Sequence, residues 1–598
     1  MNQVIRNTAL SAAISLSLLG TARADDAKDI DTVVVTANRS AVPADEVLAS
    51  VTVIERSDIE ASQAPDLLSL LARQAGMDLV RTGGPGQTNT LFLRGGIASH
   101  TLVLIDGIRV NSANQGNFDF AHLPLSQIER IEIVRGPRAA LWGSDAIGGV
   151  IHIFTRDPSA GYIEARAGSY GLGGLNAGFG TAHVAIGAGF ETQRGFSATN
   201  PAAGPGSYDP DNDGYTNRNL SLRVHGDVGT QHVALTGLIT DADVEFDIGE
   251  TAAINRELGI VLWGEINDRW SHSITLGHNS EDLNTPDFDS HFGSERSTLD
   301  WVNTFTLNAD NTLNLGANWA HETGFSESST EVSFDEGRRN LAVFASWRGH
   351  FGTQTFELSA RRDDNSQFDG ATTGNAAWGL DVNDSLRVRA SWGQGFRAPN
   401  FNELYYPGFF GFFAGNPDLR PERSISQEIG VDWLATLSQR VSVSLYRTRV
   451  RDLIAFTSPT FGAENVNRAA IDGAELDYHF EHGAFRLDGN ATWQDARNAL
   501  TDLPLLRRPD RKLSLSGSYR FSNDAALGLD ASAYSSRPDI GGDLPGYARF
   551  DLRGSLPLTA GWTLEARIEN VFDREYQLLE GYNTPGRSGV VNLRWNGK

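Results

Sequence analysis

The segments LVLIDGIRVN (Leu102–Asn111) and IERIEIVRGPRAALWGSDAIGGVIHIF (Ile128–Phe154) are the strongest indication of fold in the chain. They alternate short β-branched runs with glycine, proline and Asp-Gly breaks. Asp106-Gly107 stands between two apolar runs, which is a strong local signal for a β-hairpin. The two segments therefore predict a small, tightly turned α/β unit.

Residues that precede these segments supply further elements of the same unit. Ser57 and Glu60 have the spacing of a capping box, which predicts the start of a helical turn. Pro65 suits the first position of a second helix with a leucine-rich face, and Gly76 is placed to end it. The pattern changes around residues 156–161, so we expect a compact domain over residues 46–158.

Beyond this domain the hydrophobic pattern has a period of two. Leu513, Leu515 and Tyr519 alternate with serines, and segments such as 386–392 and 562–569 repeat the theme. Ten-residue segments with one apolar face are the signature of a membrane β-barrel, whereas soluble β-sandwiches seldom reach this length. At about 20 residues per strand and connection, residues 159–598 predict about 22 antiparallel strands. Sixteen to eighteen strands with longer loops would fit the length equally well.

Composition and the N-terminal end narrow the class of protein. The formal net charge of −24 argues against nucleic acid as a partner, and the absence of cysteine excludes disulfides and thiolate metal sites. No apolar run reaches the length that a membrane helix needs. Residues 1–24 combine a basic residue, a short apolar run and an Ala-x-Ala site, which is typical of a signal peptide.

A β-prone run, Asp31–Ala37, follows a polar stretch after the expected signal peptide. It has two interpretations. It is either the first strand of the compact domain or an exposed strand that pairs with the sheet edge of a partner protein.

Several motifs together give the chain a family resemblance. They are DTVVVTANR (31–39), LVLIDGIRVN, RGPRAALWGSDAIGGV (135–150), RRDDNSQF (361–368), FRAPN with GNPDLRPE (396–422), and ARNALTDLPLLRR (496–508). The chain resembles the TonB-dependent outer-membrane receptors, and RRDDNSQF and ARNALTDLPLLRR are closest to the cobalamin receptors among them. The resemblance implies a monomer in outer-membrane lipid, with a 22-stranded barrel and an N-terminal plug inside its lumen.

The resemblance also assigns roles to particular residues. Residues 25–45 would be a periplasmic segment that carries the TonB box, with TonB as the energising partner. Two plug arginines would face two barrel carboxylates and lock the plug to the wall; fork-shaped guanidinium–carboxylate pairs suit such an interface. The box comprises Asp31, Thr32, Val33, Val34, Val35, Thr36 and Ala37, and the lock comprises Arg94, Arg135, Glu428 and Glu475.

An acidic motif, Asp209-x-Asp211-x-Asp213-Gly214, copies the first half of an EF-hand loop. Its twelfth position is Leu220, so the loop lacks the bidentate carboxylate and needs ligands from elsewhere. Cobalamin receptors order these loops with calcium, and the resemblance implies calcium ligands at Asp211, Asp213 and Asp247, with weaker matches at Ser197 and Asn255. The alternative is an acidic surface turn.

No constellation of residues indicates an enzyme. The histidines are scattered, and neither a zinc-protease motif nor a nucleophile elbow is present. A passive porin would need neither the plug nor the box, and both are present in the sequence. Haem receptors carry a histidine in the segment that corresponds to residues 400–415, and here this segment has none. Cobalamin is therefore the expected ligand, with another corrinoid or a ferric siderophore as the alternative; the resemblance implies contacts at Thr88, Thr90, Ile97, Gln115, Gly116 and Arg507.

Overall fold

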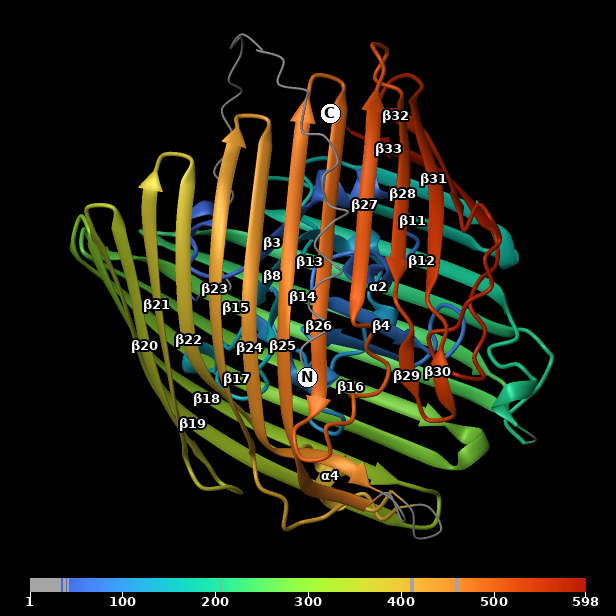
Figure 1. Cartoon of the computed structure of the whole chain (residues 1–598), viewed down its shortest axis with the longest axis horizontal. Coiled ribbons are helices and arrows are strands. Elements are labelled where there is room, and N and C mark those ends of the chain that lie inside the picture. Colours follow the sequence, from blue (N-terminus) through green and yellow to red (C-terminus); the bar gives the residue numbers. More distant parts are fainter. Residues whose placement is uncertain are drawn as a thin grey trace, which may run out of the picture.

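The computed structural model describes residues 34–35, 39, 42–204, 206–408, 413–457 and 462–597. They form a β-barrel with a small α/β plug domain inside it (Figure 1). The expected signal peptide, residues 1–24, and most of the expected TonB box lie outside the described residues. Among the described residues, no helix is both long enough and apolar enough to cross a membrane.

The plug is built on a five-stranded sheet in the order β3-β8-β9-β6-β7, in which β6 and β9 are parallel and the other pairs are antiparallel. Strand β3 is therefore an edge strand. A separate hairpin, β4–β5, three short α-helices and several 3-10 turns complete the domain. The bounds are β3 Val51–Glu55, β4 Met77–Arg81, β5 Asn89–Leu93, β6 Thr101–Ile105, β7 Ile108–Arg109, β8 Ile128–Arg135, β9 Gly149–Thr155, α1 Arg56–Ser62, α2 Leu67–Leu71 and α3 Ala139–Trp142.

Local sequence explains several turns of the plug. Asp106 and Gly107 join β6 to β7 with φ values of 48° and 86°, the left-handed pair that a two-residue type I′ hairpin turn needs.

The predicted helix ends were wrong in detail. The capping box of α1 uses Glu55 and Asp58 rather than Ser57 and Glu60, because the chain enters the helix two residues earlier.

The second plug helix also differs from the prediction. Its first position is Leu67 rather than Pro65, and Asp66 is the N-cap, since the Asp66 side chain accepts a hydrogen bond from the Ser69 backbone N–H. The helix ends at Leu71, and Gly76 instead provides a left-handed turn before β4. All four leucines of α2 are buried in the plug core.

The barrel is a closed ring of 22 antiparallel strands among the described residues, which confirms the larger of the two predicted sizes. The ring closes where β10 pairs with β33, with Ile163 opposite Trp595. The bounds are β10 Tyr162–Gly168, β11 Gly173–Gly180, β12 Val184–Phe196, β13 Asp213–Val228, β14 Gln231–Phe246, β15 Gly249–Asn267, β16 Trp270–Thr285, β17 Ser290–Asn308, β18 Asn311–Glu327, β19 Val332–Phe351, β20 Gln354–Asn365, β21 Ala371–Asn383, β22 Leu386–Arg397, β23 Glu422–Thr436, β24 Gln439–Thr457, β25 Gly462–His482, β26 Phe485–Asn498, β27 Arg511–Arg520, β28 Ala526–Tyr534, β31 Tyr547–Pro557, β32 Trp562–Glu569 and β33 Ser588–Asn596.

The period-two pattern sets which side chains face outward. Leu513 and Leu515 of β27 are 41% and 40% exposed on the outer wall, whereas Ser514 between them is 6% exposed and faces the plug. Apolar side chains therefore cover the outside of the barrel, where lipid is the solvent, and polar side chains line the lumen. This arrangement identifies an outer-membrane protein.

The two rims of the barrel differ in the length of their connections. One rim has turns as short as residues 229–230 and 268–269, and the other has connections such as 398–421 and 570–587. Short turns mark the periplasmic side and long loops the extracellular side. Helix α4, Phe401–Tyr405, lies in one of the long loops, at the bottom of Figure 1.

Candidate functional site

A buried ion-pair network joins the plug to the barrel wall at Arg94, just after β5. Its Nε and Nη2 donate to the two carboxylate oxygens of Glu475 at 3.0 and 2.7 Å, and its Nη1 donates to Glu428 at 2.6 Å. The guanidinium also lies 4.4 Å from the ring centre of Tyr446. Burial opposes its charge, but the two carboxylates outweigh that cost and raise the pKa of Arg94.

Arg135, the second arginine expected in this lock, has a different principal role. Its Nε lies 3.9 Å from Glu475, beyond hydrogen-bond distance. It donates instead to the Ala75 carbonyl at 3.0 Å and to the Thr52 hydroxyl at 2.7 Å, both within the plug. Arg135 therefore supports the plug around the contact that Arg94 makes with the wall.

Sequence reasoning missed a third arginine in the network. Arg389 of β22 contacts Glu428 through Nη1 and donates to Asp432 at 3.0 Å, while Ser50 of the plug donates to Glu428 at 2.7 Å. In the sequence Arg389 is one more charged residue in an alternating strand. Only its inward position opposite Gly430 brings it to the network.

A second network, which we call the outer clamp, consists of His100, Arg397, Glu403 and Glu422. Arg397 donates to both oxygens of Glu422 and to both oxygens of Glu403, at 2.8–3.0 Å. His100 of the plug lies 2.6 Å from Glu422 through Nε2. Glu422 is fully buried, so this cluster is a further plug–wall contact that sequence reasoning did not find.

The loop that contains α4 is bonded directly to the apex of the plug. The backbone N–H groups of Phe401 and Asn402 donate to the carbonyls of Ala113 and Asn114 at 3.0 and 3.1 Å, and the Asn400 side chain donates to the Gln115 carbonyl at 3.0 Å. The motif FRAPN thus positions a segment of the extracellular loop against the plug, rather than projecting it away.

The expected ligand contacts lie on the extracellular side of the plug and on one loop. Thr88 is exposed, whereas Thr90, Ile97, Gln115 and Gly116 are half-buried. Gly116 has φ of +78°, and a Cβ there would lie 3.1 Å from Ser99, so the turn requires glycine.

The barrel residue of the expected ligand set is paired with another loop. Arg507 donates to Asp539 at 3.0 Å, which ties its loop to the hairpin of β29 (Arg537–Asp539) and β30 (Gly542–Leu544). Its neighbour Arg508 lies over the ring of Phe92 at 3.9 Å and donates to the Gly96 carbonyl at 2.7 Å. Arg508 therefore links this loop to the plug apex, which the sequence did not reveal.

The acidic residues expected to bind calcium lie at the extracellular ends of β12–β14. The carboxylate of Asp213 accepts from the Ala198 N–H, and that of Asp247 accepts from the Thr199 hydroxyl at 2.7 Å. Slight burial and the nearby acidic residues Asp209 and Asp247 raise the pKa of Asp211. In the described part of the chain, no three His, Cys, Asp or Glu side chains are grouped to hold a metal ion.

The two weaker calcium candidates differ in position. Ser197 lies in the acidic loop, where its hydroxyl donates to the Asp209 carbonyl at 2.8 Å. Asn255 lies within β15 opposite Thr240, in the lining of a luminal pocket that also includes Glu257 and Glu281. The structure therefore does not bring Asn255 to the loop.

Family comparison supplies the identification. Residues 155–571 match the family described as TonB dependent receptor-like, beta-barrel, and residues 43–150 match the TonB-dependent Receptor Plug Domain. The chain belongs to the TonB-dependent receptor family. The receptor is 31% identical to the vitamin B12 transporter BtuB of Photobacterium profundum, over 98% of each chain.

Solved structures agree on the fold. A ferric enterobactin receptor, PfeA of Pseudomonas aeruginosa, superposes with a TM-score of 0.80 at 18% identity, covering 94% of the receptor and 100% of that chain. The copper transporter OprC gives a TM-score of 0.78 at 17% identity, covering 91% and 98%. At these identities the likeness concerns architecture alone.

Two residues of the expected TonB box fall within the described part of the receptor. Val34–Val35 form strand β1, which pairs with β2, Val42–Pro43. Val35 is fully buried in a hydrophobic cluster that includes plug residues Leu102 and Val150. The other box residues, Asp31–Val33 and Thr36–Ala37, lie outside the described residues.

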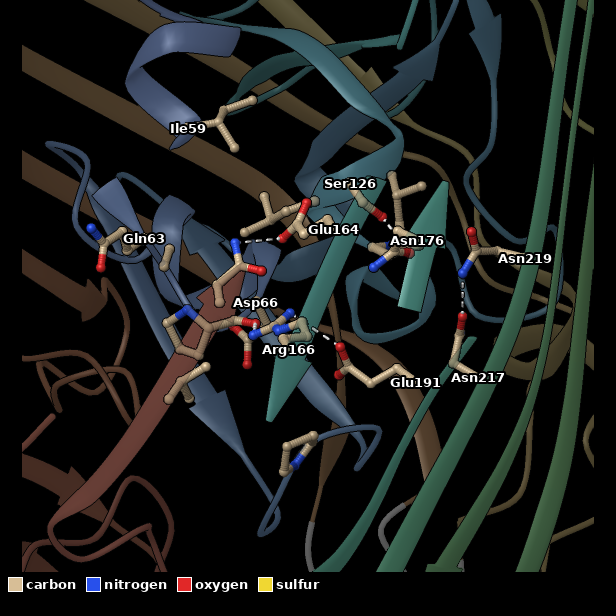
Figure 2. A pocket seen from close by; sticks show the side chains of 18 of the residues that line it. Ile59, Gln63, Asp66, Ser126, Glu164, Arg166, Asn176, Glu191, Asn217 and Asn219 are labelled. Carbon is tan, nitrogen blue, oxygen red and sulfur yellow. Dashed lines mark hydrogen bonds and ion pairs between the residues drawn. The ribbon is translucent and has the colours of Figure 1, made fainter. Parts of the chain in front are cut away.

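Cavities with mixed polar and apolar lining lie between the plug of the receptor and the wall. One of about 100 Å³ lies between the plug and strands β10–β13, β32 and β33. Figure 2 shows Arg166 in it, between Asp66 and Glu191, with the Arg166–Glu191 ion pair at 3.1 Å. A second, of about 780 Å³, lies on the periplasmic side, between β3, α1, α2 and the wall strands β21–β28. None of the expected ligand-contact residues lines either cavity.

Proposed function

We propose that the receptor imports cobalamin across the bacterial outer membrane, using energy delivered through TonB. The observation that carries this proposal is the end-to-end similarity to a vitamin B12 transporter, 31% identical over 98% of both chains. Structures of a ferric enterobactin receptor match at 16–18% identity and share the architecture only. The sequence contains no recognisable set of catalytic residues, which is consistent with a family of transporters and receptors.

The proposed ligand site lies between the plug apex and the extracellular loops. Thr88 and Thr90 offer hydroxyl groups, and Gln115 an amide, that suit the amide fringe of a corrinoid. Gly116 permits a close approach of the ligand to the backbone. Arg507 is half-buried and already oriented by Asp539, so it would present its remaining donors to the ligand.

Energy transfer is proposed to begin at β1. Pairing of residues 31–37 with a strand of TonB requires free backbone donors and acceptors on that segment. In the described structure Val34 and Val35 are paired with β2, and Val35 is packed in the plug. The box would therefore have to leave this position before TonB engages it.

Calcium is proposed as a structural ion of the extracellular loops. The donors near Asp211, Asp213 and Asp247 are all oxygens, which suit calcium, and their mutual repulsion favours a bound cation. The carboxylates of Asp213 and Asp247 now accept protein hydrogen bonds, so binding would exchange these bonds for metal–oxygen contacts.

A ligand panel tests the proposed substrate. The purified receptor is titrated with cobalamin, cobinamide, a ferric siderophore and haem in millimolar calcium, by isothermal calorimetry. Saturable binding of cobalamin, with weaker or no binding of the siderophore and haem, is the expected result. Saturable siderophore binding without cobalamin binding would overturn the proposal, and tighter binding of cobinamide would replace cobalamin with another corrinoid.

A further inference from the structure

The outer wall of the barrel carries a cluster of arginines on strands β23–β26, which run side by side (Figure 1). Four are exposed and two, Arg449 and Arg497, are half-exposed; each alternates with more deeply buried side chains that face the lumen, so each points outward. This arginine patch consists of Arg423, Arg447, Arg449, Arg451, Arg468 and Arg497.

The strand register places the patch directly above the apolar band. Ile429, Leu445, Ala474 and Trp493 are aligned across the four strands and form an outward apolar row. Arg447 lies one outward row closer to the extracellular rim on β24, about 7 Å along the strand. The other patch residues lie in the rows beyond it. The patch thus begins where lipid chains end and headgroups begin.

The charge of the patch is not balanced by the protein. Asp472 pairs with Arg447 and Arg449 at 2.7 and 2.8 Å, and Asp495 pairs with Arg497 at 2.7 Å. Asp502 also lies 3.8 Å from Arg497. Six arginines therefore face three aspartates, in a chain whose formal net charge is −24.

Two patch arginines are placed against each other. Arg423 and Arg451 are direct cross-strand partners, a like-charge pair that destabilises a sheet unless an anion lies between them. Among the described residues, neither these two nor Arg468 has an ion-pair partner. The neighbouring rim pair, Arg420 and Asp452, is neutral as a unit and adds no anion to the patch.

We propose that the arginine patch binds the phosphate groups of a phosphorylated lipid in the outer leaflet. Guanidinium groups match phosphate oxygens in fork-shaped hydrogen bonds. A lipid supplies both components that the wall presents, because its chains cover the row of Ile429 and Leu445 while its phosphates reach the arginines above. This inference does not depend on which ligand the receptor transports.

The test compares two triple variants of the full receptor. In the patch variant, Arg423→Gln, Arg451→Gln and Arg468→Gln remove the three arginines that lack an ion pair. In the control, Arg218→Gln, Arg339→Gln and Arg362→Gln remove three exposed arginines from β13, β19 and β20, so that net charge changes equally. Circular dichroism and heat-modified gel mobility verify that both variants form barrels.

The probes are diphosphoryl lipid A and its dephosphorylated form, added to delipidated receptor and followed by native mass spectrometry. Each arginine near an anionic lipid strengthens binding about five-fold, so the patch variant should bind diphosphoryl lipid A about a hundred-fold more weakly. The control variant should bind normally. Equal binding of the dephosphorylated lipid, an equal loss in the control, or equally tight binding of inorganic phosphate alone would overturn the proposal.

Discussion

Arg94 and Glu475 form a two-point hydrogen-bonded ion pair, at 3.0 and 2.7 Å, between residues that lie 381 positions apart in the chain. Both side chains are buried, at 5% and 1% exposure. The pair joins the plug to β25 through contacts that can break without covalent chemistry. The contact is therefore both directional and reversible.

Removing Arg94 should loosen the plug at this contact. In Arg94→Ala, Glu428 keeps Arg389, but Glu475 is left buried with only the distant Arg135, at a cost of about 3–5 kcal/mol. Hydrogen exchange of β4 and β5 should accelerate by at least about a hundred-fold. Arg81→Ala, which breaks a pair with Asp66 inside the plug, is the control. Unchanged exchange in Arg94→Ala would contradict the role of this pair.

The outer clamp should hold the α4 loop against the plug. In Glu422→Gln, Arg397 keeps Glu403 but loses its second carboxylate, and His100 loses its charged neighbour. We expect faster hydrogen exchange in α4, with little change in β4. Asp418→Asn, an exposed acidic residue of the same loop, is the control. Equal exchange in the two variants would show that the clamp does not position the loop.

The TonB box should tolerate a side-chain change but not the loss of a backbone donor. Val34→Pro removes an N–H group and should abolish cobalamin uptake by cells while leaving ligand binding intact. Val34→Ile keeps the donor and the β propensity, and should transport normally. Uptake is measured with labelled cobalamin. Normal uptake by the proline variant would exclude strand pairing at this position.

Calcium should tighten ligand binding by ordering the acidic loop before the ligand arrives, since less entropy is then lost on binding. Calorimetric titration of cobalamin with calcium and with chelator should show weaker binding under chelation. Asp211→Asn together with Asp213→Asn should reproduce the weak binding and remove its calcium dependence. The same affinity with and without calcium would favour an acidic surface turn.

The fold was predictable because its signals are local. The Asp106-Gly107 turn needs two left-handed residues, and the alternation around Leu513 follows from having lipid on one side and polar lumen on the other. The ion-pair partners of Arg94 were available only through the resemblance, because no local pattern links residues hundreds of positions apart. The resemblance did not identify Arg389 and His100 either, because their roles depend on the register of the barrel strands around the plug.

The start of helix α1 was predicted wrongly for a different reason. Ser57 and Glu60 have the right chemistry for a capping box, but Glu55 and Asp58 have the same spacing and form the box instead. The choice depends on where β3 ends, which is set by its pairing with β8 rather than by the helix itself.

The position of β3 has a mechanical consequence. β3 is the first strand of the plug sheet along the chain and lies at its edge, so its backbone is hydrogen-bonded to a neighbouring strand on one side only. Its other flank borders the cavity of about 780 Å³, which gives a displaced strand room to move. A load on the chain before β1 would meet the β1–β2 pairing and the Ser50–Glu428 hydrogen bond before it reaches the sheet, where the Val51–Val134 pairing beside Arg135 is the first contact. We expect the plug to yield from this corner, one strand at a time, while the hairpin held by Arg94 stays anchored to the wall.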